Sequence, residues 1–256
     1  MKRLLMILMS SLVLLLTPMH AGAITGGQVD TRDRYPFVGL LAFYNDQGEY
    51  EHRCTGTLLS STVVLTAAHC TDGMALTYAY FQITVPDDFR ENPTGITGTP
   101  HTHPAFRSNT LNNDVGIIVL DQPVNLDEYP TIVGEGFLSD LKRSHEIQDD
   151  TFVAVGYGVQ TGFPPPTQIV DLLRRFSVSP YGGLTRGNLH LQQNPYATGG
   201  GGTCFGDSGG PHFWLDTLII VSVTSWGDAV CRSNDMTQRV DLPSVQEFLA
   251  EFGISP

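Results

Sequence analysis

From residue 24 onward, short apolar runs alternate with clusters of turn residues. The runs are rich in Val, Ile, Leu, Thr and aromatic residues, and the clearest span residues 37–44, 56–67, 115–120, 152–155 and 218–225. Gly, Pro, Asn and Asp gather between them, which is typical of strands joined by tight turns. No segment alternates strand with helix in the way that a parallel sheet requires. The pattern therefore predicts an all-β fold.

The C-terminus departs from this pattern. Over residues 243–252 the apolar positions fall on one face at helical spacing, with Pro243 at the start and Gly253 just beyond the end. Both residues stand at the helix boundary that each prefers, so we expect a packed terminal helix. Residues 126–150 are mixed in polarity and show no clear strand before Thr151. This stretch is predicted to connect two domains.

The composition excludes one class of partner. The chain has 256 residues, of which 41% are hydrophobic and 16% charged, as suits a compact folded protein. With 26 acidic and 14 basic residues the net charge is -12, and no basic run occurs beyond the first three positions. Nucleic-acid binding needs a basic surface, so we expect no nucleic-acid partner. The acidic balance indicates a soluble surface.

Residues 1–23 have the pattern of a secretory signal peptide. Lys2 and Arg3 lead, an apolar run covers residues 4–16, and residues 21–23 read Ala-Gly-Ala, like a cleavage site. A transmembrane anchor needs roughly 20 apolar residues, which is longer than this run. We therefore expect a secreted protein, extracellular or periplasmic, without a stable membrane anchor.

Three short motifs carry side chains for nucleophilic catalysis. Residues 206–211 place Ser208 in a glycine-flanked turn, where missing β-carbons let a substrate carbonyl approach. His69 precedes a cysteine at the end of an apolar strand, and Asp114 stands at the start of another. Each alone has a structural interpretation, as a loop serine, a core histidine or a turn carboxylate. Together, in the order His, Asp, Ser, they supply the nucleophile, base and orienting group that peptide hydrolysis needs.

These motifs resemble those of the trypsin and chymotrypsin family. The resemblance implies two six-stranded antiparallel β-barrels with a C-terminal helix, and an active site in the cleft between the barrels. It covers essentially all of residues 24–256. The matching strings are Thr-Ala-Ala-His-Cys at 66–70, residues 103–120, Gly-Asp-Ser-Gly-Gly-Pro at 206–211 and Ser-Trp-Gly at 225–227. The first barrel would span about 30–125, the linker about 126–150, the second barrel about 151–241 and the helix about 243–252.

The resemblance also assigns catalytic roles. It implies that His69 is the base, Asp114 its orienting carboxylate and Ser208 the nucleophile. The backbone N–H groups of Gly206 and Ser208 would form the oxyanion hole.

Export would place the four cysteines in an oxidising compartment, where they can form two disulfides. Three pairings are compatible with the sequence alone. The family resemblance implies one of them, with Cys54 bonded to Cys70 and Cys204 bonded to Cys231.

Members of this family become active when a new α-amino group inserts beside the aspartate that precedes the nucleophile. The resemblance assigns this pair to Ile24 and Asp207. Thr25 stands where valine is usual, and Ala23 stands where a trypsin-activated precursor carries Lys or Arg. We therefore expect signal peptidase to cut after Ala23 and release an active enzyme. The alternative is an earlier cut, followed by trimming by another protease.

The specificity pocket departs from that of trypsins. Gly202 stands where trypsins carry an aspartate at the pocket base, and an uncharged base favours apolar or small side chains before the scissile bond. Asp235 aligns with the pocket wall, as in the similar crab-type collagenolytic proteases, which accept basic and apolar residues. A surface position for Asp235 is the alternative, so the primary preference is predicted as basic, apolar or both. The substrate-binding residues implied by the resemblance are Gly202, Thr203, Phe205, Ser225, Trp226, Gly227 and Asp235.

The sequence therefore predicts a secreted serine endopeptidase that forms an acyl-enzyme on Ser208. We expect a monomer that binds protein or peptide substrates and, as a further class of partner, protein inhibitors. No cofactor or metal is expected, and His101 and His103 are interpreted as surface residues. The alternative is a catalytically silent secreted binding protein on a protease scaffold, although such homologues usually lose a triad residue. An α/β-fold esterase does not fit, because its triad runs in the order Ser, Asp, His.

Overall fold

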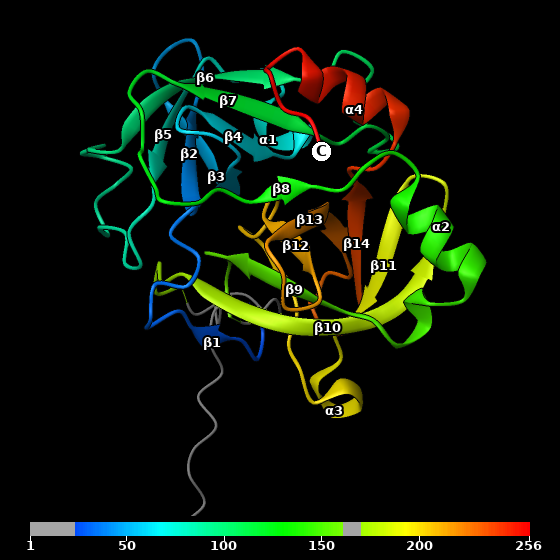
Figure 1. The fold of residues 1–256 in the computed structure, drawn as a ribbon. Helices are drawn as coiled ribbons and strands as arrows, with labels where there is room; N and C mark the ends of the chain where they lie inside the picture. The colour runs from blue at the N-terminus through cyan, green and yellow to red at the C-terminus, as the bar shows by residue number, and fades with distance from the viewer. Residues whose placement is uncertain (1–23, 161–169) are drawn as a thin grey trace, which may run out of the picture.

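The computed structural model describes residues 24–160 and 170–256, which form two β-barrels stacked one on the other (Figure 1). The first barrel has six antiparallel strands and closes in the order β2-β3-β4-β7-β6-β5. Its strands are β2 (Val38–Tyr44), β3 (Tyr50–Leu58), β4 (Val63–Thr66), β5 (Leu76–Tyr80), β6 (Ile96–Thr102) and β7 (Gly116–Leu120).

The second barrel also closes with six antiparallel strands, in the order β9-β10-β11-β14-β13-β12. Two short strands join it from outside: β1 (Gln28–Val29) pairs with β10, and β8 (Thr131–Ile132) runs parallel to β13. The barrel strands are β9 (Thr151–Gly156), β10 (Arg175–Leu184), β11 (Asn188–Gln192), β12 (Pro211–Trp214), β13 (Ile219–Gly227) and β14 (Asn234–Arg239). The architecture confirms the predicted all-β fold with two six-stranded barrels.

Strand β2 explains why part of the first barrel appears in the sequence as an unbroken apolar run. All of its residues are buried, because the strand both lines the first barrel and contacts β9 of the second. A strand that is buried on both faces loses the usual alternation of polar and apolar positions. The run is therefore also a sign that another layer covers this strand.

A buried arginine joins the two barrels. The Arg174 guanidinium, directly before β10, lies 3.0 Å from Asp30, and both side chains are fully buried. It also donates to the carbonyl oxygens of Val38 at 3.1 Å and Phe81 at 2.9 Å, both on the first-barrel side. Asp33 is a second carboxylate partner. These acceptors compensate a charge whose burial would otherwise be costly.

The connection between the barrels contains a helix that the sequence pattern did not predict. Helix α2 (Phe137–Ser144) lies there, followed by the short 3-10 helix η1 (Ile147–Asp149). In α2 Leu138 is buried and Phe137 and Leu141 pack beside it on the core, but this apolar face spans little more than one turn, too short to stand out in a sequence. The Leu138 N–H donates to Asp241 Oδ2 at 2.9 Å, and this carboxylate favours the positive end of the helix.

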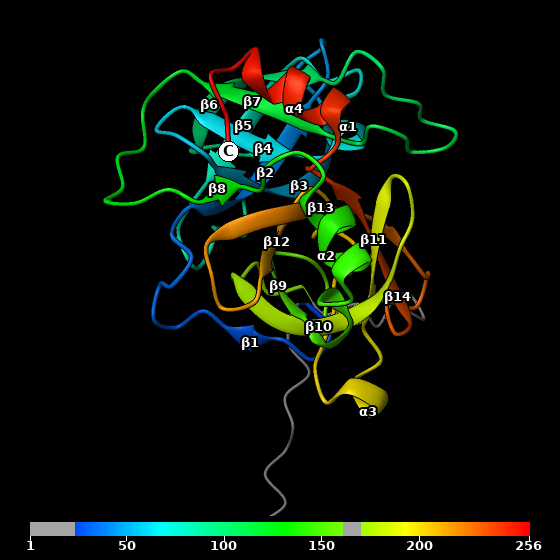
Figure 2. The ribbon, with the colours of Figure 1, turned by 45° about the vertical axis from the view of Figure 1, so that its right-hand side comes forward.

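Helix α4 (Pro243–Ala250) follows the second barrel but packs on the first (Figures 1 and 2). The Phe248 ring lies 4.9 Å from the His103 ring, and His103 Nε2 lies 3.0 Å from the Ser244 carbonyl oxygen. His103 is therefore buried, because α4 covers it. The expectation that His103 lies on the surface is wrong. Two further helices are single turns: α1 (Ala68–Thr71) and α3 (Pro195–Thr198).

Within residues 24–160 and 170–256, no helix has both the length and the apolar character needed to cross a membrane. The predicted signal peptide, residues 1–23, lies outside the described residues.

Candidate active site

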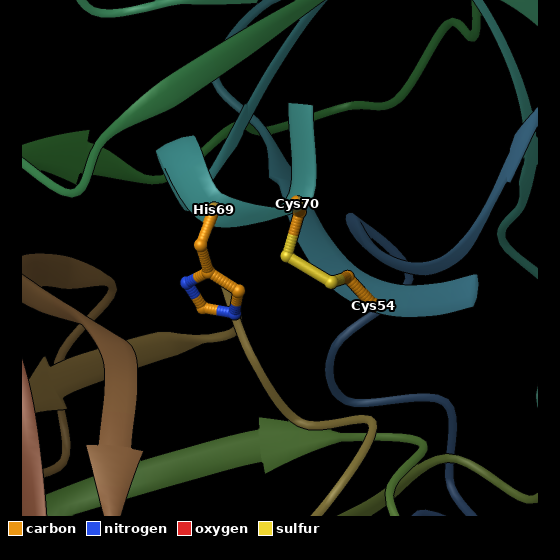
Figure 3. A group of neighbouring side chains, drawn as sticks. All are labelled: Cys54, His69 and Cys70. Carbon is orange, nitrogen blue, oxygen red and sulfur yellow. A yellow bond between two sulfur atoms is a disulfide. The ribbon is translucent and has the colours of Figure 1, made fainter. Parts of the chain in front are cut away.

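Helix α1, which follows β4, carries His69. The next residue, Cys70, forms a disulfide with Cys54 of β3, and Figure 3 shows this bond beside the imidazole. The three side chains lie close enough together to hold a metal ion, but metal binding needs thiolates and both sulfur atoms are in the disulfide. The cluster is therefore a covalent clasp that fixes α1 to β3 next to the imidazole.

Asp114, two residues before β7, orients this imidazole. Its Oδ2 lies 2.8 Å from His69 Nδ1, and its Oδ1 accepts the His69 backbone N–H at 2.8 Å. From the second barrel, the Ser225 hydroxyl donates to Oδ2 at 2.5 Å, while the Asp114 N–H donates to Gln238 Oε1 at 3.1 Å. The donors from His69 and Ser225 compensate a fully buried carboxylate. With Nδ1 bound to Asp114, Nε2 is left to accept a proton.

Ser208 lies in a tight turn before β12, and the first barrel holds this turn in place. Thr55 of β3 contacts it twice: its N–H donates to the Ser208 carbonyl at 2.9 Å, and its hydroxyl donates to the Gly206 carbonyl at 2.9 Å. Gly209 has a φ of +77°, and a Cβ there would lie 2.1 Å from Thr66 Oγ1. The turn thus requires glycine directly after the serine.

Within the described chain, two backbone N–H groups, those of Gly206 and of Ser208 itself, are free at the nucleophile turn. Gly206 has a φ of +99°. Among the residues that the structure describes, neither its N–H nor that of Ser208 donates to a protein acceptor. The N–H of Asp207 between them donates instead to the Cys204 carbonyl at 3.0 Å. The N–H groups of Gly206 and Ser208 are therefore both free to donate to one acceptor. Two free N–H groups in this arrangement can bind a developing oxyanion.

His69 and Ser208 face a common cleft of about 390 Å³. The disulfide between Cys204 and Cys231 forms part of its wall. Sequence analysis had missed Asp228, which also lines the cleft. Burial raises the pKa of Asp228, but backbone N–H donors outweigh this and lower it overall, so the carboxylate is ionised. The expected substrate-binding residues that line the cleft are Thr203, Phe205, Ser225, Trp226 and Gly227.

Gln193 covers the expected base of the pocket. A Cβ on Gly202 would lie 2.1 Å from Gln193 Cβ and 2.2 Å from its Oε1, so the glutamine side chain fills the space that a larger residue would need. Gln193 lines the cleft and Gly202 does not. Gln193 Nε2 donates to the Asn234 carbonyl at 3.1 Å, which fixes the side chain. Sequence analysis missed Gln193 because it follows β11, outside every motif.

Asp235 lies behind the cleft wall. It stands opposite Gly227 in the pairing of β13 with β14, yet it does not line the cleft. Its side chain is fully buried, so the surface position considered above is wrong, and its Oδ2 lies 3.0 Å from His212 Nε2 in β12. Within the described part of the chain, Asp235 Oδ1 and His212 Nδ1 have no partner. No sequence motif pointed to His212.

Asp207 is buried behind the nucleophile turn. Its carboxylate accepts the Gly158 N–H at 2.7 Å and the Cys204 N–H at 2.9 Å. Burial raises the pKa of Asp207 to about 7, although both N–H donors lower it. The buried carboxylate is therefore only partly compensated.

The segment that begins at Ile24 docks on the second barrel. Ile24 is fully buried, and Thr25 forms an isolated bridge with Gly202. The Thr25 hydroxyl lies 3.2 Å from the Gly202 carbonyl and 3.1 Å from the Cys231 carbonyl, beside the pocket disulfide. In this chain Ile24 is joined to Ala23, so it carries no α-amino group that could pair with Asp207.

The sequence is similar to those of known proteins. The sequence model of the family described as Trypsin matches residues 24–246. Alkaline trypsin B of Manduca sexta is 27% identical over 243 residues, which cover 87% of this chain and 89% of that protein. Brachyurin of Leptuca pugilator is 31% identical over 221 residues, which cover 80% of this chain and 87% of that protein.

Solved structures show the same fold. The structure of HL collagenase superposes with a TM-score of 0.69 at 18% identity, covering 90% of this chain and 99% of the other. A mutant of human heparin binding protein superposes with a TM-score of 0.66 at 19% identity, covering 90% and 99%.

Proposed function

The chain belongs to the trypsin family of serine proteases, and on that premise we propose that it is a secreted endopeptidase that cleaves peptide bonds through an acyl-enzyme on Ser208. One observation carries the proposal. The Asp114 carboxylate, held by groups from both barrels, binds His69 Nδ1, and the imidazole faces the same cleft as Ser208. This is the arrangement that activates a serine hydroxyl.

In the proposed reaction Ser208 Oγ attacks the scissile carbonyl carbon and passes its proton to His69 Nε2. Asp114 stabilises the imidazolium that results. The N–H groups of Gly206 and Ser208 bind the oxyanion, and the loss of one such donor typically costs about 10²–10³ in rate. His69 then gives the proton to the leaving amine. A water molecule, deprotonated by the same nitrogen, releases the acid product from the acyl-enzyme.

Cleavage after Ala23 would complete the enzyme. Asp207 is a buried carboxylate with a raised pKa, and among the described residues it forms no ion pair. An α-amino group on Ile24, whose segment already docks on the second barrel, would supply the missing positive charge. An opposite charge at short range favours the ionised carboxylate.

The cleft supports a primary preference for apolar side chains, basic side chains or both. Its base is the uncharged Gln193, and two partly exposed aromatic residues, Phe205 and Trp226, line it. The ionised Asp228 on its lining supplies negative charge for a basic residue. Relatives that carry the names trypsin and brachyurin are consistent with peptide substrates.

The second candidate is a silent binding protein. It is favoured by the heparin binding protein structures, but their likeness at 19% identity concerns the fold alone. The hydrogen bond between Asp114 and His69, together with a cleft that His69 and Ser208 both line, favours catalysis over binding.

Cleavage profiling tests the proposal. The secreted protein and its Ser208→Ala variant would be incubated with a mixed peptide library, and the new termini identified by mass spectrometry. We expect internal cuts that the variant does not make, after apolar residues, basic residues or both. Intact peptides with a folded wild-type protein whose N-terminus is Ile24 would refute the enzymatic proposal and leave the binding protein.

A further inference from the structure

Arg53 lies against the glycine of the proposed oxyanion hole. It stands two residues before Thr55 on β3, and residues at this spacing share a face of a strand. Thr55 contacts the nucleophile turn through Ser208 and Gly206, so this face of β3 borders the turn. A Cβ on Gly206 would lie 3.2 Å from Arg53 Nε and 3.4 Å from its Nη2.

The charge of Arg53 has no counterpart in the described residues. The guanidinium forms no ion pair, and its buried Nε has no hydrogen-bond partner. Burial lowers the pKa of Arg53, while Tyr50, a neighbouring hydrogen-bonding side chain, and Asp207 raise it without forming an ion pair, and an arginine stays charged in proteins. The other arginines with little exposed side chain each have a carboxylate: Arg174 has Asp30 and Asp33, Arg175 has Asp171, and Arg239 has Asp241.

The position of Arg53 relative to the cleft decides what could approach it. The acyl side of a substrate would occupy the cleft, whose lining includes Ser225, Gly227 and the Cys204–Cys231 disulfide. Arg53 does not line this cleft and borders Gly206 from β3. Arg53 therefore borders the oxyanion site from outside this cleft, on the side of β3, where residues beyond the cleaved bond can extend.

We propose that Arg53 binds a carboxylate on the leaving-group side of the scissile bond, on the second residue after it. The inference rests on the proposed peptidase function and adds a second determinant of its specificity. A guanidinium binds carboxylates through paired, charge-assisted hydrogen bonds. The carboxylate can come from an Asp or Glu side chain or from a C-terminus. Such a contact is expected to change reactivity about tenfold or more.

Acyl transfer isolates this side of the site. An ester substrate without any residue after the scissile bond forms the acyl-enzyme, and an added dipeptide then competes with water for it. The amine of the dipeptide attacks the acyl carbon, its proton passes to His69, and Ser208 Oγ leaves and regains a proton. Peptide product and acid product both form from the same acyl-enzyme. Their ratio is therefore independent of how fast the ester acylates the enzyme.

Two pairs of probes distinguish the sources of the carboxylate. Gly-Glu amide against Gly-Gln amide tests a side chain, and Gly-Gly against Gly-Gly amide tests a C-terminus. We expect the acidic member of at least one pair to give a ratio about tenfold higher. Arg53→Met should abolish that preference and Arg53→Lys should keep part of it. Arg186→Met, which removes the same charge from an exposed loop, is the matched control and should keep all of it.

Equal ratios for the acidic and neutral members of both pairs in the wild type would overturn the inference. So would an acidic preference that survives in Arg53→Met. A variant that forms the acyl-enzyme is folded, so a lost preference there cannot be attributed to unfolding. No acyl-enzyme in the wild type with a free Ile24 would overturn the proposed function, and this inference with it.

Discussion

The buried carboxylate of Asp207 makes the stability of the uncut chain depend on pH in a defined way. Burial raises its pKa from 3.8 to about 7. Between these two values the folded chain binds a proton that the unfolded chain has released, so the folded state loses stability as pH rises. The gap of about three pH units corresponds to about 4 kcal/mol, fully lost above about pH 7.

A free α-amino group on Ile24 should remove this loss, because an ammonium beside Asp207 lowers its pKa and keeps it ionised. Two chains in the Ser208→Ala background, which prevents self-digestion, provide the comparison: one begins at Ile24 and the other at Ala23. Urea unfolding of each would be measured from pH 4 to pH 8. We expect the chain that begins at Ile24 to be the more stable, and the difference to widen by about 4 kcal/mol over this range.

Adding Asp207→Asn to both chains is the control, and it should remove the pH dependence of the difference. Parallel pH profiles for the two chains without this change would refute the reasoning. They would mean that Ile24 does not reach Asp207, and the proposed activation by a cut after Ala23 would fail.

Three further changes test other parts of the structure. Asp114→Asn should lower kcat about 10⁴-fold at similar KM, because the amide no longer favours the imidazole form with a proton on Nδ1; a loss below tenfold in a peptide assay would contradict the proposed role. Gly202→Asp should lower the free energy of unfolding by about 1–3 kcal/mol, because its side chain meets Gln193, and adding Gln193→Ser should restore stability in urea titrations. An unchanged midpoint in the single variant would show that Gln193 moves aside. Replacing Cys54 and Cys70 by alanine together should cost about 3 kcal/mol, measured by thermal unfolding, since the disulfide closes a loop with a sequence separation of 16; a loss under 1 kcal/mol would show that α1 is held by other contacts.

The fold was predictable because its signals are local. Apolar runs such as residues 37–44 and 115–120 mark strands by themselves, and the family motifs supplied their arrangement. Helix α2 was not predictable, because it is short: its apolar residues Phe137, Leu138 and Leu141 share one face but span little more than one turn within a stretch of mixed polarity. Its start depends on Asp241, a hydrogen-bond partner about a hundred residues later in the chain.

In the candidate site, too, residues in local motifs were predictable and residues placed by long-range contacts were not. His69, Asp114 and Ser208 stand in recognisable motifs, so sequence reasoning could name them before their contacts were known. The pairing of Asp235 with His212 joins β14 to β12 across β13, and no pattern within one segment reports such a contact. Gln193 escaped notice for a related reason: whether the space beside a glycine is open depends on which side chain from elsewhere fills it.

The contacts of Asp114 determine when the candidate active site can be completed during synthesis. His69 and Asp114 emerge early, but the hydroxyl of Ser225 and the amide of Gln238 follow 111 and 124 residues after Asp114. Helix α4, which covers His103 in the first barrel, emerges later still. The growing chain therefore carries a first barrel that α4 does not yet cover, and an Asp114 carboxylate that lacks its Ser225 donor, until the second barrel has emerged. If the proposed function holds, a nascent chain is consequently inactive toward neighbouring proteins while it is being made.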